Sequence, residues 1–460
     1  MQTGQPKLRF APSPTGLLHP GNARIAVLNW LFASHHNGRF LLRIDDTDRE
    51  RSTAAYEQAI RNDLAWLGLS YDDSFRQSDR MRFYQDAMKQ LQDIGRLYPC
   101  YETAQELKLK RKIQLAQGKP PRYDRAALDC SRADLDRFAA EGRKPHWRFK
   151  LDHDAIIWED LVRGSVQFDA AQISDPVLVR EDGRPLYSLT SVVDDGHGKI
   201  THIVRGEDHV TNTAVQIQIF TALGFAIPDF AHLPLLTAGD GANLSKRDGS
   251  FSLADLRTQE IEAPALLAML AKLGTGSQVT GLETIAELQQ DCSFARFGLA
   301  SARFDLAQLR LASTRCLRAQ SFADLQHTMP DLADSDAALF DLVRGNLEKK
   351  SDIAFWRQRL SADRANAPVE WPIEWVIDQS VRKTVLQAAL DHLPDEIPDI
   401  DAARSWMQAS CTQAGIAGRV FFMTVRLALT GVQYGPELPL LAVFLGHTNI
   451  ARRLHQAIND

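Results

Sequence analysis

The fold class of this chain is predicted most directly by residues 9–45, RFAPSPTGLLHPGNARIAVLNWLFASHHNGRFLLRID. Residues 8–11, LRFA, predict a short strand. Apolar side chains at three-to-four spacing predict a helix over residues 23–36, and Asn37-Gly38 is typical of a helix end. Residues 39–45 then predict a buried strand. Strand, turn, helix and strand make a βαβ unit, whose right-handed crossover indicates a parallel sheet and an α/β fold.

The turn between the first strand and the helix carries Gly16, His19 and Gly21. A glycine-bearing loop at this position aims backbone N–H groups from the positive end of the helix, which suits a phosphate. The glycines let a nucleotide approach closely, and His19 offers a further donor. The same residues are compatible with a plain connecting loop whose histidine caps the helix. Turn chemistry alone leaves both interpretations open.

The composition bounds the class of protein. With 460 residues, 44% hydrophobic and 24% charged, the chain predicts a globular protein of several domains. A formal net charge of −5 gives no global signal for nucleic acid. Five scattered cysteines without a C-x-x-C pair argue against a zinc cluster or a disulfide framework. The polar start and the short apolar runs predict neither a signal peptide nor a membrane span, so we expect a soluble, cytoplasmic protein.

Further along the chain, helices and strands are expected in mixed order at first, and only helices are expected toward the end. Helices are expected at residues 53–67 and 80–95, and a charged, irregular insertion at 101–173. Residues 177–195 and 200–209 are expected to resume the sheet, followed by a helix at 213–223 and a buried strand at 232–238. An amphipathic helix at 263–274 is closed by Gly274, and residues 320–460 predict helices almost throughout.

A second loop whose residue types suit a role in binding or catalysis is NLSKRDGS, residues 243–250. Ser245, Lys246 and Arg247 lie between Gly241 and Gly249, which would allow the loop to move. Two adjacent cations on such a loop can clamp a triphosphate and stabilise the charge of leaving pyrophosphate. A solvated surface loop is the alternative when this stretch is considered alone.

Together the two loops resemble the class I aminoacyl-tRNA synthetases, and more narrowly their glutamyl branch. The resemblance rests on RFAPSPTGLLHPGNARIAVLNWLFA, RIDDTDRERS, RQSDR, LVRGSVQFD, DPVLVREDGRPLYSLTSVVDD, HIVRGEDH and LSKRDG, and it extends to LRLALTG near the end. It implies a Rossmann-like catalytic domain (residues 1–100 and 174–245), an inserted acceptor-binding domain (101–173), a stem-contact region (246–319) and an all-α anticodon-binding domain (320–460).

The resemblance also implies site residues. Those expected to bind ATP are His19, Gly21, Asn22, Asp208, Ser245, Lys246 and Arg247. Those expected to bind glutamate are Arg9, Ala11, Ser13, Asp45, Tyr187, Ser191 and Arg205. The HIGH element corresponds to Pro12, Ser13, Pro14, Thr15, Gly16, His19, Pro20, Gly21 and Asn22, and the KMSKS element to Asn243, Leu244, Ser245, Lys246 and Arg247.

The residue types suit the implied reaction. A guanidinium, as in Arg9 or Arg205, recognises a carboxylate through paired hydrogen bonds, and the Asp45 carboxylate suits an ammonium group. Structural ion pairs are the alternative for the arginines, a turn cap for Asp45 and core packing for Tyr187. The resemblance implies attack of the glutamate α-carboxylate on ATP, with Mg²⁺, and then transfer to tRNA. Positioning and charge stabilisation carry both steps, so we nominate no catalytic triad, and we expect activation to require bound tRNA.

The sequence departs from the commonest pattern of the branch at several positions. Asn243 replaces the first lysine of the KMSKS element, Asp45 replaces a glutamate, and Ser191 stands where asparagine is frequent. Pro20 replaces an aliphatic residue and fits a first helical turn. Some relatives bind zinc in the insertion through a cysteine cluster. Here the insertion and its edge hold only Cys100 and Cys130, so we expect no structural zinc.

The C-terminal part raises the question of tRNA. Residues 321–460 hold 13 Lys plus Arg against 18 Asp plus Glu, so recognition there would require a local basic stripe, with residues 344, 349, 350, 419 and 426 as candidates. Asn346 lies near the position where relatives that reject tRNA(Gln) carry an arginine, which suggests charging of tRNA(Gln) as well as tRNA(Glu). The absence of a heptad seam favours a monomer.

Four rival interpretations are weighed. A glutaminyl-tRNA synthetase would end in a β-barrel, and the shortened relatives that glutamylate a tRNA base lack a C-terminal bundle. A non-catalytic tRNA-binding paralogue is favoured by Asn243 but disfavoured by His19, Gly21 and Lys246. A small-molecule nucleotidyltransferase of the same superfamily would leave the helical C-terminal part without a purpose.

Overall fold

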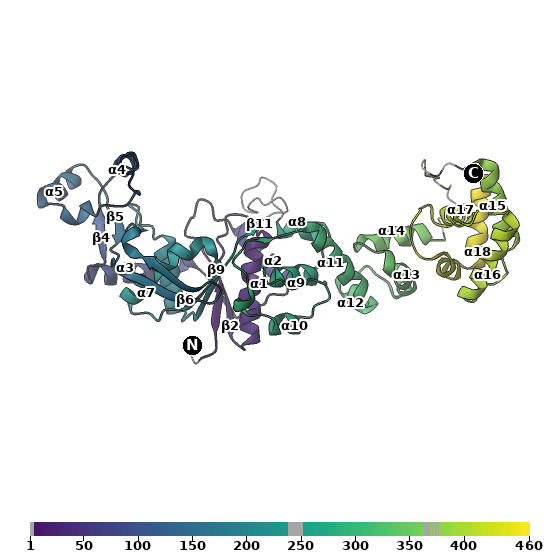
Figure 1. Ribbon diagram of the computed structural model, residues 1–460, viewed down its shortest axis with the longest axis horizontal. Coiled ribbons are helices and arrows are strands. Elements are labelled where there is room, and N and C mark those ends of the chain that lie inside the picture. The colour runs from purple at the N-terminus through teal and green to yellow at the C-terminus, as the bar shows by residue number, and fades with distance from the viewer. Residues whose placement is uncertain (1–3, 238–251, 363–368, 370, 373–374, 376) are drawn as a thin grey trace. The chain divides into compact units, whose positions relative to one another are not determined.

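The computed structural model describes residues 4–237, 252–362, 369, 371–372, 375 and 377–460. The chain divides into two compact units, Met1–Leu309 and Arg310–Asp460, which are described separately (Figure 1). The predicted KMSKS residues 243–247 lie outside the described residues. None of the helices in the described ranges is long and apolar enough to cross a membrane.

The opening βαβ unit is confirmed. Strand β1 (Lys7–Phe10) pairs in parallel with β2 (Arg39–Ile44), and β2 pairs in parallel with β3 (Asp73–Arg76). Helix α1 (Pro20–His35) begins three residues earlier than the apolar periodicity indicates, because Pro20 occupies its first turn. Helix α2 (Ala54–Trp66) connects β2 to β3 and is capped by the Thr53 hydroxyl.

A second sheet has the strand order β7-β6-β10-β9. Strands β9 (His202–Gly206), β10 (Asp229–Leu233) and β6 (Ala155–Asp160) are parallel, and β7 (Gly164–Asp169) runs antiparallel to β6. Helix α7 (Val210–Leu223) connects β9 to β10. Strands β6 and β7 come from the segment expected to be irregular, so part of that segment is regular sheet.

The prediction that residues 177–195 resume the parallel sheet is wrong. Only β8 (Val177–Val179) is a strand, and it pairs with β5 (His146–Phe149), which pairs antiparallel with β4 (Leu97–Cys100). Residues 187–197 form helix α6 (Tyr187–His197). Its buried residues Leu189, Val192 and Val193 have helical spacing, and burial against helices α7 and α3 (Met81–Asp93) outweighs the strand propensity of the two valines.

Several helices complete the first unit. Helix α4 (Ala104–Ala116) and helix α5 (Arg132–Ala140) lie in the segment after β4, and each begins with a capping box. Helices α8 (Leu253–Thr258), α9 (Ala263–Lys272) and α10 (Ile285–Gln290) follow the undescribed loop, and α9 and α10 pack on α1. Strands β11 (Leu236–Thr237) and β12 (Ala302–Arg303) pair just before helix α11 (Leu306–Ala319).

The regular elements described in the second unit are helical, as predicted (Figure 1). They include most of α11, together with α12 (Phe322–Thr328), α13 (Ala337–Val343), α14 (Ser351–Leu360), α15 (Gln379–Asp391), α16 (Ile400–Ala414), α17 (Gly418–Thr430) and α18 (Leu438–Asn459). Trp356 is buried in their common core, and the Trp406 indole donates to the Ala389 carbonyl. Helix α18 bends at Gly446, whose φ of 69° is outside helical geometry.

Candidate active site

A cavity of about 740 Å³ opens where β1 and β9 end and helix α1 begins. Parallel strands present their carboxyl ends at the same edge of a sheet, which is where open α/β folds bind ligands. Twelve of the predicted residues line it: Arg9, Ala11, Pro12, Ser13, Thr15, His19, Gly21, Asn22, Asp45, Tyr187, Arg205 and Asp208.

Other predicted residues do not line this cavity. Pro14, Gly16 and Pro20 shape the loop and the start of α1 without facing it. Ser191 is buried on α6, where its hydroxyl accepts a hydrogen bond from Arg43 at 3.2 Å. The structure therefore places Ser191 behind the cavity wall, so its hydroxyl would reach a ligand only through other side chains.

The structure shows one of the two roles that the sequence left open for His19, the helix cap. It is the N-cap of α1, and its Nδ1 accepts hydrogen bonds from the backbone N–H groups of Gly21 and Asn22 at 3.1 and 3.4 Å. Burial lowers the pKa of His19. The ring is thus neutral, with Nδ1 as acceptor and the proton on Nε2, and it lines the cavity as a donor.

The two glycines of this loop differ in their surroundings. A Cβ on Gly21 would lie 2.8 Å from the His19 ring, so any side chain there displaces the imidazole. A Cβ on Gly16 would meet nothing within 4 Å. The close approach that requires glycine at position 21 is therefore to His19 itself.

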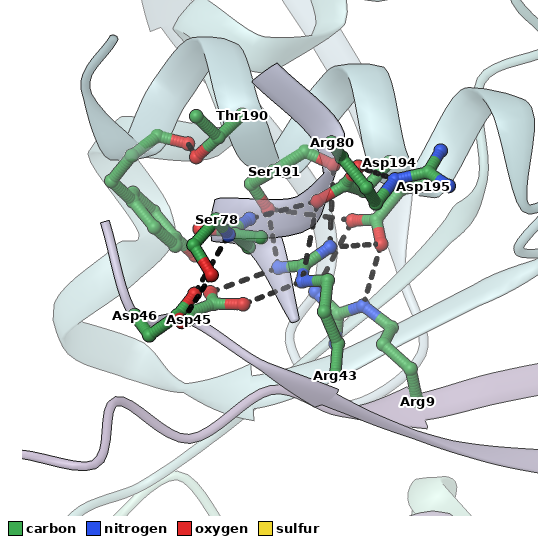
Figure 2. A network of polar contacts seen from close by, with 12 residues as sticks. Arg9, Arg43, Asp45, Asp46, Ser78, Arg80, Thr190, Ser191, Asp194 and Asp195 are labelled. Carbon is green, nitrogen blue, oxygen red and sulfur yellow. Dashed lines mark hydrogen bonds and ion pairs between the residues drawn. The ribbon is translucent and has the colours of Figure 1, made fainter. Parts of the chain in front are cut away.

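One wall of the cavity is a network of buried ion pairs (Figure 2). Arg9 donates to both carboxylate oxygens of Asp195, at 3.0 and 3.3 Å. Arg43, 1% exposed, donates to both oxygens of Asp45, at 2.6 and 3.1 Å, and to Asp195 at 2.8 Å. Charge in this wall is thus closely matched, as buried carboxylates require.

The same network fixes Asp45. Burial raises the pKa of Asp45 to about 6, against the opposing effect of its ion pair with Arg43. A carboxylate has about four acceptor positions, and Arg43 uses one on each oxygen. The remaining positions are available to a cation in the cavity that Asp45 lines.

Asp194 anchors the network from behind. Its oxygens accept hydrogen bonds from Arg80 at 2.6 Å and from Gln77 and the Tyr84 hydroxyl at 2.9 Å. Arg43 lies 3.9 Å from it (Figure 2). Three elements, β2, α3 and α6, are thereby held together behind the cavity.

A second wall of the cavity presents Arg205 among neutral partners. Its Nε donates to His232 Nε2 at 3.2 Å, its Nη1 to the Tyr187 hydroxyl at 2.9 Å, and its Nη2 to Thr213 and Gln216. Within the described part of the chain, no carboxylate lies within ion-pair distance of Arg205. Burial lowers the pKa of Arg205, and the neighbouring charge of Arg9 lowers it further.

The sequence analysis missed several of these residues. Arg43 was visible as a charged residue inside the apolar strand RFLLRID, which is a signal for a buried partner. Arg24 lines the cavity and donates to the carbonyls of Pro234 and Leu273, both at 2.8 Å, bracing the loop before β11. His232 and Asp160 carried no local signal, because 72 residues separate them in the chain.

In the second unit, Asn346 ends the short 3-10 helix Arg344–Asn346 and is half-buried. Arg344 donates to the Gln320 carbonyl at 2.6 Å and lies over the Phe340 ring. Arg426 donates to the Pro436 carbonyl at 2.8 Å, and Arg419 is exposed. The candidate cations Arg344 and Arg426 thus already make intramolecular contacts.

Comparisons with known proteins match both units. The family model for the catalytic domain of class I tRNA synthetases (E and Q) matches residues 6–304, and the model for an anticodon binding domain matches residues 318–458. A glutamate–tRNA ligase of Zymomonas mobilis is 45% identical over 451 residues, covering 98% of this chain and 99% of that protein. One of Rhodospirillum rubrum is 47% identical, covering 97% and 98%.

A crystal structure of a glutamate tRNA ligase from Elizabethkingia meningosepticum, in complex with its amino acid, has a TM-score of 0.85 at 25% identity and covers 99% of both chains. The chain belongs to the class I tRNA synthetases of the E and Q family. Within that family, its full-length relatives place it among the glutamate–tRNA ligases.

Proposed function

We propose that the chain uses ATP to activate L-glutamate as glutamyl-adenylate and transfers the glutamyl group to the 3′ end of tRNA(Glu). The observation that carries this proposal is the pairing of a carboxylate and an uncompensated guanidinium in one cavity. Asp45 suits the ammonium group of an amino acid, and Arg205 suits a side-chain carboxylate. Glutamate carries both groups.

Each substrate group then has an assigned partner. Nη1 of Arg205 donates one of its two N–H groups to the Tyr187 hydroxyl, which leaves the second for the glutamate γ-carboxylate. Arg9 uses Nε and Nη2 on Asp195 and keeps Nη1 for the same carboxylate. Ala11 and Ser13 shape the pocket between these groups. This arrangement holds the glutamate α-carboxylate toward the start of α1.

The phosphates of ATP would lie at that helix start. The Nε2–H of His19 and the helix dipole both favour negative charge there. Gly21 and Asn22 are assigned to ATP with His19, and Asp208 to its adenosine end. We expect Mg²⁺ to arrive with the triphosphate of ATP.

The reaction proceeds by displacement. An α-carboxylate oxygen of glutamate attacks the α-phosphorus, the bond to the β-phosphate oxygen breaks, and pyrophosphate leaves. The ribose hydroxyl at the tRNA 3′ end then attacks the activated carbonyl, and AMP leaves. Ser245, Lys246 and Arg247 are assigned to the triphosphate, with Asn243 supplying no charge. Positioning and charge stabilisation supply the rate enhancement.

The assigned partners are tRNA(Glu) and, through Asn346, tRNA(Gln). We assign residues 101–173 to the acceptor end, 246–319 to the stem and 320–460 to the anticodon. The matched anticodon binding domain supports the last assignment. We further infer a cytoplasmic monomer without structural zinc.

Pyrophosphate exchange and aminoacylation test the proposal. We expect glutamate-dependent exchange between pyrophosphate and ATP that requires tRNA, and charging of total tRNA with glutamate but not glutamine. Charging with glutamine, or no reaction with either amino acid, would contradict it.

Purified tRNA(Gln) tests the wider specificity. Formation of Glu-tRNA(Gln) supports the role of Asn346, and Asn346→Arg is expected to reduce this product while leaving tRNA(Glu) charging unchanged. No product from wild type would reject the extension to tRNA(Gln).

A further inference from the structure

Arg205 is held from behind by a histidine that has no contact with the cavity described above. His232, on β10, is 0% exposed, and its Nε2 accepts the hydrogen bond from Arg205 Nε. The Thr213 hydroxyl lies 2.8 Å from the same Nε2. Because the guanidinium always carries its proton, Nε2 of His232 must present a lone pair to it.

Asp160, at the end of β6, determines that state of His232. One Asp160 oxygen, Oδ1, accepts backbone N–H groups from Val162, Arg163 and His232 at 3.0 to 3.1 Å. The other, Oδ2, contacts His232 Nδ1 at 2.5 Å. Since an ionised carboxylate only accepts hydrogen bonds, Nδ1 carries the proton and Nε2 is free to accept.

The electrostatics of the pair agree with this assignment. Burial lowers the pKa of His232, so its ring is neutral near pH 7. Burial alone would raise the pKa of Asp160, but the hydrogen bonds from His232 and the backbone lower it overall. A protonated His232 would instead direct an N–H at Arg205, and two cations would face each other in a buried site.

We propose that Asp160 and His232 are positioning residues that fix Arg205, through the Nδ1–H tautomer of His232, in the orientation that binds the glutamate γ-carboxylate. This rests on the proposed role of Arg205. The chain Asp160–His232–Arg205 replaces a direct carboxylate partner by a neutral acceptor. Arg205 is thereby held in place while its charge stays unneutralised for the substrate, in the way that outer partners orient metal-binding histidines.

Asp160→Asn tests the tautomer directly. Three backbone donors require an oxygen at the Oδ1 position, so the amide NH₂ must occupy the Oδ2 position and donate to Nδ1. His232 is then forced to protonate Nε2, which opposes Arg205. We expect kcat/KM for glutamate to fall by about 10- to 100-fold, through KM, the loss expected for one or two charge-assisted hydrogen bonds. The KM for ATP is expected to stay within about twofold.

Asp169→Asn is the matched control. Asp169 is an exposed aspartate at the end of β7 whose oxygen accepts from the Ala171 backbone N–H, and it has no contact with Arg205. We expect its kinetic constants to equal those of wild type. Equal losses for glutamate and ATP in Asp160→Asn would indicate a structural role alone and would overturn the proposal.

A second pair of variants protects the test if Asp160→Asn fails to fold. His232→Gln keeps an acceptor near the Nε2 position, whereas His232→Asn places its amide near Nδ1 and leaves Arg205 Nε without an acceptor. We expect the glutamate KM to rise more in His232→Asn than in His232→Gln at similar Tm. Equal glutamate KM values in the two variants would reject the positioning role.

Nitrogen-15 NMR of the histidine-labelled full chain separates this inference from the proposed function. A protonated Nδ1 and an unprotonated Nε2 on His232 are expected in wild type, and the reverse in Asp160→Asn. The opposite tautomer of His232 in wild type would overturn the inference even if the protein attaches glutamate to tRNA. Absence of glutamate-dependent exchange with the expected tautomer present would instead reject the proposed function.

Discussion

The two walls of the cavity handle buried charge in opposite ways. On one wall, Arg9 and Arg43 are matched by Asp45 and Asp195 at hydrogen-bond distance. On the other, Arg205 has hydroxyl, amide and imidazole partners. A buried ion pair already has its charge compensated, whereas a buried unmatched charge gains most from an arriving ligand. The comparison separates a wall whose charges are already paired within the protein from one whose cation has only neutral partners.

The largest expected effect comes from removing the unmatched charge. Arg205→Met should lower kcat/KM for glutamate by about 1,000-fold or more, because the γ-carboxylate would enter a pocket without its guanidinium. The free energy of unfolding should change little. Removal of an uncompensated buried cation stabilises the fold, and this offsets the hydrogen bonds that the partners of Arg205 lose. Steady-state pyrophosphate exchange and urea unfolding measure the two quantities.

Arg61→Met is the control for this variant, since Arg61 pairs with Glu57 on helix α2 and has no place in the cavity. Its glutamate kinetics should match those of wild type. Retention of full glutamate activity in Arg205→Met would contradict the division between the two walls.

The matched wall should respond in stability. Arg43→Met leaves the buried carboxylates of Asp45 and Asp195 without their shared cation, so the free energy of unfolding should fall by about 3–5 kcal/mol. Urea unfolding at pH 7 measures the loss. Arg51→Met breaks an exposed pair with Asp48 and should leave the free energy of unfolding nearly unchanged. Similar losses in the two variants would show that the buried network is not what stabilises this wall.

Protonation of Asp45 offers a weaker perturbation of the same wall. Its pKa is raised to about 6, so the carboxylate gains a proton as the pH falls through that value. A neutral carboxyl group does not pair with an ammonium group, and kcat/KM for glutamate should therefore fall about tenfold per pH unit well below pH 6. The KM for ATP should show no such acidic limb, that is, no change as the pH falls below 6.

In Asp45→Asn the limb should disappear, with kcat/KM at pH 8 lowered to a constant value. A profile for Asp45→Asn that retains the wild-type limb would assign the titration to another group.

The smallest effect concerns the start of α1. Gly21→Ala places a Cβ against the His19 ring, and displacement of this donor should raise the KM for ATP by about tenfold. Gly16→Ala adds its Cβ to open space and should leave the KM for ATP within about twofold. Pyrophosphate exchange at varied ATP compares the two. An unchanged KM in Gly21→Ala would remove His19 from ATP binding.

The sequence predicts the parts of this molecule that are local. Residues 9–45 determine a βαβ unit because turn residues, periodicity and the helix end lie side by side in the chain. Residues 177–195 were misassigned because Val192 and Val193 favour strands, whereas packing of this segment on α7 and α3 selects the helix.

The site shows the same division between local and distant information. The resemblance of motifs named twelve of the residues that line the cavity, including Arg205, but it did not indicate that Arg9 is already paired with Asp195. The pair of Asp160 and His232 was invisible, because it forms only when β6 and β10 meet. Partners behind a site depend on tertiary pairing, which a single sequence does not reveal.

His19 has a consequence for the reach of helix α1. The first amides of the helix bind Nδ1 and thereby assign the imidazole proton to Nε2, on the far side of the ring. The polarity of the helix is in this way transmitted through an aromatic ring, as if the helix were extended by one imidazole. A helix that begins at the cavity rim can therefore offer a hydrogen-bond donor beyond its own first amides.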